Sequence, residues 1–321
     1  MSALIRGAAL GLAVFCGLAL AEEGWTLTEG GRSLEIEAAA IPVPPSMLGD
    51  TVRQTGAWHL TASDPSFGGL SGLLLDGRAL TAVTDKGDWL TAELRREGGR
   101  LTFSNARMAP MIGGGGKRLA RRGGDFADAE GLALTPTGLA VSLERVHRAI
   151  LYTPDGTPVA VHQERRFNGF ANNGGIEGLA SLPDGALLAL IEEPEADGIP
   201  VMVLRHGSRP LEGRLAAPSR HSVTGADIGP DGRLYVVFRH FSPATGVSIR
   251  LRRYALGEDG LPLSDSREEL AAWEALSGID NMEAVAVVSG AGGLTAWILS
   301  DDNFNAKSGQ RTLLLSLSIA D

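Results

Sequence analysis

Short apolar segments separated by polar turns recur along most of the chain. An apolar run of about five residues reaches an Asp-Gly turn, as at 183–185 and 230–232, and a second apolar run follows. Runs of this length between turn residues predict strands paired in antiparallel hairpins. A third run follows a charged corner, at 149–152, 201–205, 249–254 and 312–318. Only residues 268–276 predict a helix, because Leu270, Trp273 and Leu276 would share one face.

Five stretches of the chain can be aligned with one another. They read Gly-Leu-Ser-Gly-Leu, Asp-Ala-Glu-Gly-Leu-Ala, Gly-Ile-Glu-Gly-Leu-Ala, Ser-Val-Thr-Gly-Ala-Asp and Asn-Met-Glu-Ala-Val-Ala, with equivalent positions at Ser71, Glu130, Glu177, Thr224 and Glu283. These positions are 59, 47, 47 and 59 residues apart. Repeats of this period indicate an array or a propeller rather than two unrelated domains.

The repeats predict an all-β fold, a β-propeller of four-stranded antiparallel blades. The last repeat ends after three strands, and a ring must close without a free edge, so residues 56–61 are expected to supply the missing strand. We count five blades, with a sixth possible from residues 33–41. The predicted organisation is a signal peptide at 1–21, an N-terminal segment and linker at 22–52, and the propeller at 53–321.

The first 21 residues have the features of a secretory signal peptide. Arg6 precedes an apolar run at 10–20 that is too short to span a membrane, and Ala-Leu-Ala at 19–21 forms a cleavage site. We therefore expect a mature chain in the periplasm or secreted, with no membrane attachment after cleavage. The single cysteine, Cys16, lies in the signal, so the mature protein should contain neither a disulfide nor a thiol nucleophile.

Composition narrows the choice of partner. Hydrophobic residues make up 44% and charged residues 21%, as in globular proteins. The net charge of −9 argues against a nucleic-acid surface, which needs clustered Lys and Arg. We expect a monomer that acts on a small anionic ester.

Three of the five aligned positions are glutamates, which a propeller would bring together around its axis. Carboxylates held close together repel one another unless one is protonated or a cation neutralises them. Because the candidate ligands are all oxygens, we predict a Ca²⁺ site formed by Glu130, Glu177 and Glu283. The alternative is that these side chains cap neighbouring blades by accepting backbone hydrogen bonds.

Charged corners follow the second strand of each repeat, and antiparallel pairing places them at the same mouth as the glutamates. The mixture of acids and bases suits metal-assisted hydrolysis of an anionic ester. No serine or cysteine nucleophile with a base is identifiable. The predicted catalytic residues are Asp85, Glu192, Asp301 and Asp302, and the predicted substrate-binding residues are Lys86, Arg145, Arg239 and Asn303. The alternative for any single corner is an ordinary solvated loop.

Several of these stretches resemble the bacterial phytase-like family, described as having "esterase-like activity of phytase". They are Phe-Gly-Gly-Leu-Ser-Gly-Leu at 67–73, Thr-Asp-Lys-Gly-Asp-Trp at 84–89, Asp-Ala-Glu-Gly-Leu at 128–132, Asn-Gly-Gly-Ile-Glu-Gly-Leu at 173–179, Asp-Asn-Met-Glu at 280–283, Ser-Asp-Asp-Asn-Phe at 300–304, and Gln310. The resemblance covers roughly residues 50–320 and implies a β-propeller with hydrolytic activity. The sequence departs from the family pattern in two places: Thr-Asp-Lys-Gly at 84–87 stands where the family has Ser-Asp-Arg-Gly, and Ala284 follows Glu283 where the family has glycine. Neither change removes a carboxylate.

The first hypothesis is an exported, Ca²⁺-dependent hydrolase of phosphate or carboxylate esters that uses water as its nucleophile. A lactonase is the nearest enzymatic alternative, because Ca²⁺ propellers of the gluconolactonase type also place such a glutamate on the metal. The alternative from another class is a binding module in which Ca²⁺ is structural.

Cleavage of the signal peptide defines the expected N-terminus. Protein recovered from the cell envelope should begin at Glu22, and intact mass spectrometry would measure this directly. A soluble cytoplasmic pool that retains Met1 would contradict the signal prediction.

Overall fold

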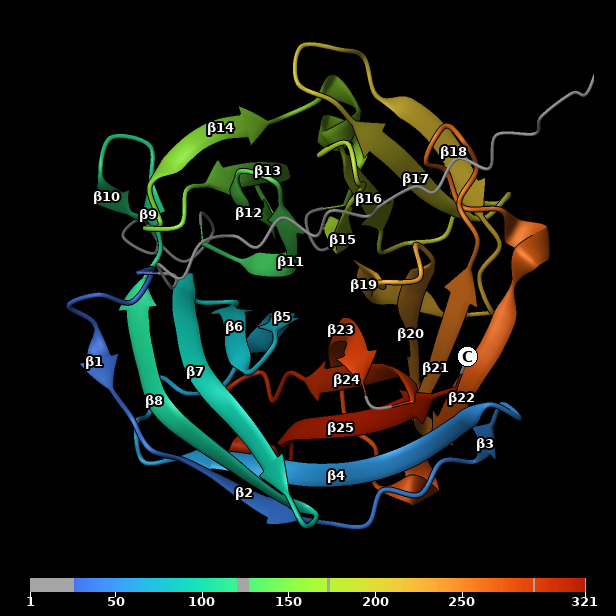
Figure 1. Ribbon diagram of the computed structural model, residues 1–321. Coiled ribbons are helices and arrows are strands. Elements are labelled where there is room, and N and C mark those ends of the chain that lie inside the picture. The colour runs from blue at the N-terminus through green and yellow to red at the C-terminus, as the bar shows by residue number, and fades with distance from the viewer. Residues whose placement is uncertain (1–25, 120–126, 172–173, 291, 321) are drawn as a thin grey trace, which may run out of the picture.

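The computed structural model describes residues 26–119, 127–171, 174–290 and 292–320, so the predicted signal peptide lies outside the described residues. Five antiparallel sheets are arranged in a ring around the centre of the molecule (Figure 1). The fold is therefore an all-β propeller, and the count of five blades is confirmed. No helix in the described ranges combines the length and apolar character needed to cross a membrane.

Blades 1 to 3 follow one another along the chain, with the innermost strand first in each. Blade 1 contains β5 (Leu70–Asp76), β6 (Ala79–Thr84), β7 (Asp88–Glu97) and β8 (Arg100–Pro110). Blade 2 contains β11 (Ala129–Thr135), β12 (Gly138–Leu143), β13 (Arg148–Tyr152) and β14 (Pro158–His162). Blade 3 contains β15 (Ile176–Ser181), β16 (Leu187–Ile191), β17 (Ile199–Leu204) and β18 (Leu211–Leu215).

Blades 4 and 5 complete the ring. Blade 4 contains β19 (Ser222–Ile228), β20 (Leu234–Ser242), β21 (Gly246–Tyr254) and β22 (Glu268–Glu274). Blade 5 contains β23 (Met282–Gly290), β24 (Gly293–Ser300), β25 (Thr312–Ile319) and β4 (Val52–Ala62). Apart from three strands of the N-terminal segment, the described elements outside the blades are a small ribbon and short 3₁₀ turns: β9 (Ile112–Gly113), β10 (Lys117–Arg118), η2 (Arg165–Gly169), η3 (Ser264–Ser266), η4 (Ala275–Ser277) and η5 (Ala306–Ser308).

The ring closes where the two ends of the propeller chain meet. Strand β4 pairs antiparallel with β25, the last strand of the chain, as the sequence predicted for residues 56–61. In Figure 1 these strands run side by side in blue and red. Residues 33–41 do not form a sixth blade; instead β2 (Ile36–Ala40) adds an outer strand to blade 5.

The N-terminal segment contacts more than one blade. Besides β2 on blade 5, β1 (Arg32–Ser33) pairs with β8 of blade 1 and β3 (Met47–Leu48) pairs with β22 of blade 4. The outer edges of three adjacent blades are therefore covered by one continuous stretch, whereas β14 and β18 end their sheets.

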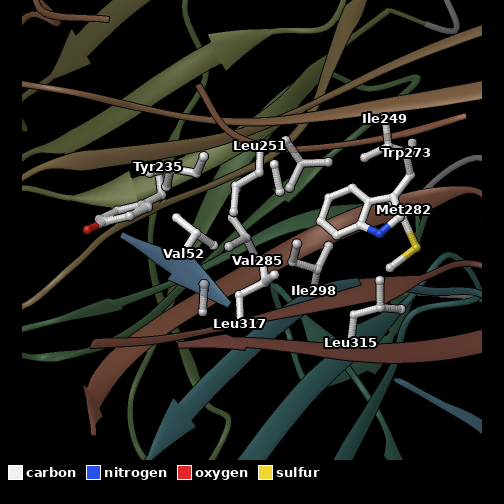
Figure 2. Packing of buried hydrophobic residues seen from close by; sticks show 14 of the residues in the cluster. Val52, Tyr235, Ile249, Leu251, Trp273, Met282, Val285, Ile298, Leu315 and Leu317 are labelled. Atoms are coloured by element: carbon white, nitrogen blue, oxygen red, sulfur yellow. The ribbon is translucent and has the colours of Figure 1, made fainter. Parts of the chain in front are cut away.

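Hydrophobic cores fill the spaces between neighbouring blades. Figure 2 shows the one between blades 4 and 5, where Trp273, Ile298 and Leu315 pack together. Strand β25 contributes to two of these cores, because successive side chains point to opposite faces. Its residues Leu315 and Leu317 face blade 4, and Leu314 faces blade 1. Burial on both faces explains why such strands appear as nearly continuous apolar runs.

The helix predicted at 268–276 is wrong. Residues Glu268–Glu274 form β22, which pairs with β21 along its length. Leu270 and Trp273 are buried, as a helical face would require, but Leu276 is fully exposed. Spacings of three and four residues do not distinguish a helix from a strand that is buried on both faces, and here the open edge of β21 takes β22 as its partner.

Side chains of the closing strand β4 should contribute strongly to the stability of the protein. Trp58 of β4 is buried, stacks on Trp297 with ring centroids 6.1 Å apart, and lies under Arg96. Trp58→Ala should lower the free energy of unfolding by about 3–5 kcal/mol, measured by urea denaturation. The control is Leu276→Ala, since the fully exposed Leu276 contributes no buried surface. Equal stabilities for the two variants would contradict this role of the closing strand.

Candidate functional site

All five inner strands carry a pairing irregularity at the aligned position. The register with the second strand shifts between Leu70 and Gly72, Ala129 and Leu132, Ile176 and Gly178, Val223 and Gly225, and Met282 and Ala284. The shifts contain the positions aligned from the sequence. A β-bulge leaves a residue unpaired and re-aims its side chain. Ser71, Glu130, Glu177 and Glu283 line a common cavity, whereas the Thr224 hydroxyl donates to the Met282 carbonyl oxygen at 2.8 Å.

The small residue after each bulge allows the inner strands to approach closely. A Cβ atom on Gly131 would lie 2.7 Å from the Leu179 Cβ of the next blade, and one on Gly225 would lie 2.5 Å from the Glu283 carbonyl oxygen. Both distances are too short for real carbon contacts, so glycine is required there. The Glu-Gly pairs therefore have a packing reason as well as a chemical one.

The corner residues are fixed beside the bulges by a repeated backbone hydrogen bond. In four blades the N–H of the corner donates to the carbonyl oxygen two residues before the bulge, at 2.8–3.0 Å: Asp85 to Gly69, Glu144 to Asp128, Glu192 to Gly175 and Asp301 to Asn281. In blade 4, Arg239 occupies this place, paired with Ser222. Starts of first strands and ends of second strands thus share one mouth, as predicted.

The resulting cavity has a volume of about 590 Å³ and is strongly acidic. Its lining includes two guanidinium groups, Arg145 and Arg239, and nine carboxylates: Asp85, Asp128, Glu130, Glu144, Glu177, Glu192, Asp280, Glu283 and Asp301. Arg145 pairs with Asp128, and Arg239 lies 3.7 Å from Glu192. The acids outnumber the bases even before a substrate enters.

Burial and mutual repulsion raise the pKa values of these acids. Burial is the larger cause for Glu130 and Glu177, followed by neighbouring carboxylates, and their pKa values lie well above the ordinary range. Burial and then the charge of Asp301 raise the pKa of Asp85 to about 7. Burial and then Asp128 likewise raise the pKa of Glu144 to about 7. At neutral pH these carboxyl groups therefore tend to hold protons unless a bound cation replaces them.

Two sets of acids are close enough to share an ion. Ligand oxygens of Asp128, Glu130 and Glu144 lie within 4.8 Å of one another, and so do those of Glu144, Glu177 and Glu192. Glu144 belongs to both sets. Glu283 belongs to neither, and its Oε1 accepts a hydrogen bond from Asn281 at 2.5 Å. Glu130, Glu177 and Glu283 line the same cavity, but their sharing of one cation remains a prediction.

Most of the other predicted site residues also meet here. Asp85, Glu192, Asp301, Arg145, Arg239 and Asn303 all line the cavity. Asp302 and Lys86 are not in the lining. The Asp302 Oδ1 accepts the N–H groups of Gly69 at 2.9 Å and Phe304 at 3.0 Å, so it ties blade 5 to blade 1. The Lys86 ammonium lies over the Phe304 ring, 2.8 Å from its centroid.

The sequence prediction assigned no role to three of the acids, Asp128, Glu144 and Asp280, and the first two lie beside predicted cation ligands. Asp128 precedes its bulge by two residues and contacts Arg145, and Glu144 is a corner that lies between both acidic sets. The aligned repeats place Asp128 two residues before its bulge and Glu144 at a corner. In the structure a backbone hydrogen bond joins these two positions, so both lie beside the bulge. A carboxylate at either of these two repeat positions could therefore have been named a candidate site residue from the sequence.

The arrangement offers oxygen ligands, proton acceptors and anion-binding groups within one cavity. The carboxylates suit a hard cation such as Ca²⁺ or Mg²⁺. Asp85 Oδ1 is buried without a hydrogen-bond partner among the described residues, which is costly unless a ligand or proton occupies it. Asp301, whose pKa burial raises to about 6, can accept a proton near neutral pH.

Comparison with known families and structures gives one match of substantial length. The model of the phytase-like family, described as "Esterase-like activity of phytase", matches residues 65–304. No curated protein matches the chain.

The chain is also similar to several solved structures. A gluconolactonase from Xanthomonas campestris is 15% identical with a TM-score of 0.46, covering 88% of this chain and 99% of that one. A calcium-binding regucalcin from Agrobacterium tumefaciens is 12% identical with a TM-score of 0.42, covering 88% and 94%. A putative glucose dehydrogenase from Thermus thermophilus is 18% identical with a TM-score of 0.37, covering 88% and 100%. These sequence identities and TM-scores are too low to carry an argument about the chemistry of this chain.

The raised pKa values predict how the stability of the metal-free protein changes with pH. Unfolded carboxyl groups ionise near pH 4, whereas Asp85 and Glu144 retain protons in the folded state up to about pH 7. The folded state therefore binds more protons in this window, and the free energy of unfolding should fall as pH rises through it. Carboxyls with lowered pKa values, such as Asp64 and Asp155, act in the opposite sense only below about pH 4. Histidines whose pKa values burial lowers from 6.5, such as His147 and His221, act in the opposite sense below about pH 6.5.

We expect the urea midpoint of chelator-treated protein to be higher at about pH 6.5 than at about pH 8, because the carboxyl groups with raised pKa values lose their protons over this range. The double variant Asp85→Asn, Glu144→Gln should show a smaller difference between the two, because two of the titrating groups are gone. A midpoint that rises over this range in the wild-type protein would contradict the electrostatics described above.

Proposed function

The chain belongs to the phytase-like family, and we propose that it is a metal-dependent hydrolase of phosphate or carboxylate esters. The observation that carries the proposal is the convergence of four bulge residues and five corner residues on one acidic cavity. Capping of neighbouring blades accounts for Thr224, whose hydroxyl donates to a backbone carbonyl. It does not account for the excess of buried carboxylates in the same cavity.

We propose that Glu130, Glu177 and Glu283 hold the cation, together with Asp128 and Glu144. The donor set consists only of oxygens and favours Ca²⁺ over softer metals. A cation bound there would polarise an ester oxygen and lower the pKa of water. The raised pKa values fit this role, since a divalent charge would replace the protons that these acids otherwise retain.

Other residues of the cavity would bind the substrate and move the proton. Arg239 has a buried Nε without a hydrogen-bond partner among the described residues, which leaves a donor for an anionic oxygen. Arg145 and Asn303 add donors at the same mouth. Asp85 and Asp301, with pKa values of about 7 and 6, are suited to accept a proton from water near neutral pH. Among the described residues, the Ser71 hydroxyl donates to the Gly69 carbonyl oxygen at 3.4 Å rather than to a base.

We further propose that the protein acts as an exported monomer on a small anionic ester. A screen of phosphate esters, carboxylate esters and lactones, with Ca²⁺ and with a chelator, separates the proposal from its alternatives. Turnover of lactones alone would favour a lactonase. Tight Ca²⁺ binding without any turnover would favour a binding module.

The variant Glu177→Gln tests the acidic site. It keeps the size of the side chain but removes one charge from a crowded set, so it should weaken Ca²⁺ binding and reduce hydrolysis at least tenfold. Repulsion falls as well, so the metal-free protein should be as stable as wild type or more so. Glu97→Gln is the matched control, because Glu97 is exposed on the outer hairpin of blade 1.

Calorimetric Ca²⁺ titration, ester hydrolysis and urea denaturation provide the three readouts. A structural cap would give a different pattern, with stability lowered by about 1 kcal/mol and metal affinity unchanged. That pattern, together with wild-type turnover, would refute the site.

A further inference from the structure

The cavity is not symmetric about the propeller axis, because one wall is apolar. Phe241 and Val247 are the apolar residues of its described lining. Both belong to the hairpin between β20 and β21, which extends beyond the corner position of Arg239, whereas β6, β12 and β16 end just before their corners. The hairpin of blade 4 therefore forms one wall of the cavity mouth, whereas blades 1, 2 and 3 turn back at their corners.

The apolar surface of this wall is covered only in part, since Val247 packs partly against the core between blades 4 and 5 and Phe241 is left exposed. Phe241 and Val247 are paired across the hairpin, so their side chains lie on the same face, and 59% of Phe241 is exposed. An exposed aromatic residue beside a polar cavity is a common feature of a ligand contact, because such sites combine apolar walls with a few polar groups.

The hairpin is also held in place without a ligand. Near its tip, the Ser242 and Thr245 hydroxyl groups hydrogen-bond at 2.6 Å. At its base, His221 Nε2 and Ser248 Oγ hydrogen-bond at 2.9 Å, and the His221 ring contacts that of His240. A wall that is already ordered loses little conformational entropy when a ligand packs on it.

Beyond its corner residue, the loop after β24 supplies uncharged groups to the lining. It contributes Asn303, Asn305, Ser308 and Gln310, all neutral hydrogen-bonding groups. The two guanidinium groups in the described lining, Arg145 and Arg239, are corner residues. A substrate with several phosphates would place its additional charges near carboxylates, because one divalent cation leaves the formal charge of the lining negative.

We propose that the substrate is an ester with an uncharged aryl or alkyl substituent, which packs on Phe241 and Val247 while the reacting group lies among the acids. A multiply phosphorylated ring fits this cavity poorly. The inference rests on the proposed hydrolysis and specifies its substrate class.

The test compares benzyl and methyl esters of acetic acid and of phosphoric acid in the presence of Ca²⁺. Benzyl and methyl alcohols have similar acidities, so a difference in kcat/KM reports contacts of the substituent rather than leaving-group chemistry. We expect wild-type protein to prefer the benzyl ester about tenfold or more, because apolar contacts of this size supply such discrimination. Inositol hexakisphosphate should be a poorer substrate than benzyl phosphate.

Two variants test whether Phe241 is responsible for the preference for the benzyl ester. Phe241→Ala should reduce the benzyl preference to about threefold or less by lowering kcat/KM for the benzyl ester, and Phe241→Leu should keep most of it. Val159→Ala is the matched control, since Val159 is equally exposed but lies on β14 at the outer edge of blade 2. Melting temperatures of the variants establish that the fold is intact.

The possible failures are distinguishable. Hydrolysis by wild-type protein with equal rates for benzyl and methyl esters, or a preference unchanged in Phe241→Ala, overturns the substrate class and leaves the hydrolase proposal standing. Preferred hydrolysis of inositol hexakisphosphate also overturns it. Absence of hydrolysis for every ester overturns both proposals together.

Discussion

Crowding of like charges around the ring axis is the constraint on which the other features of this protein depend. Nine carboxylates line one cavity, and burial raises the pKa values of several of them. The fold holds them there through its backbone rather than through compensating bases: bulges aim the inner side chains, and backbone hydrogen bonds hold four of the corners. The energy of this arrangement is provided by apolar packing between the blades. This packing offsets the cost of holding like charges together around the axis.

The repeated part of this design could be predicted from the sequence. Aligning the repeats identified Glu130, Glu177 and Glu283 as equivalent, and the structure places all three in one cavity. In a propeller each sequence repeat forms one blade, so equivalent positions of the repeats lie at equivalent places around the axis. The same logic located the closing strand, since a ring without a free edge needs a partner for β25.

Features that break the repeat could not be predicted in this way. The charge of Asp302 suggested chemistry, yet its carboxylate binds the backbone N–H groups of Gly69 and Phe304, a contact that depends on how blades 5 and 1 meet. The strand at Glu268–Glu274 resembled a helix because burial on both faces removes the alternation that marks a half-exposed strand. The Phe241 wall has no counterpart in the other repeats with which it could be aligned. Each depends on contacts between segments that are distant in sequence.

Closure of the ring also determines the order in which the molecule can be completed. The Thr55 hydroxyl donates to the Ser316 carbonyl oxygen across 261 positions of sequence, because β4 is made early and β25 is made last. Until β25 emerges during synthesis, β4 has an unpaired edge, and such edges pair readily with other chains. Contacts of this separation also slow folding, since a long loop must close before its contacts form. The final strand, less than a dozen residues long, therefore sets the moment at which a growing chain becomes a propeller.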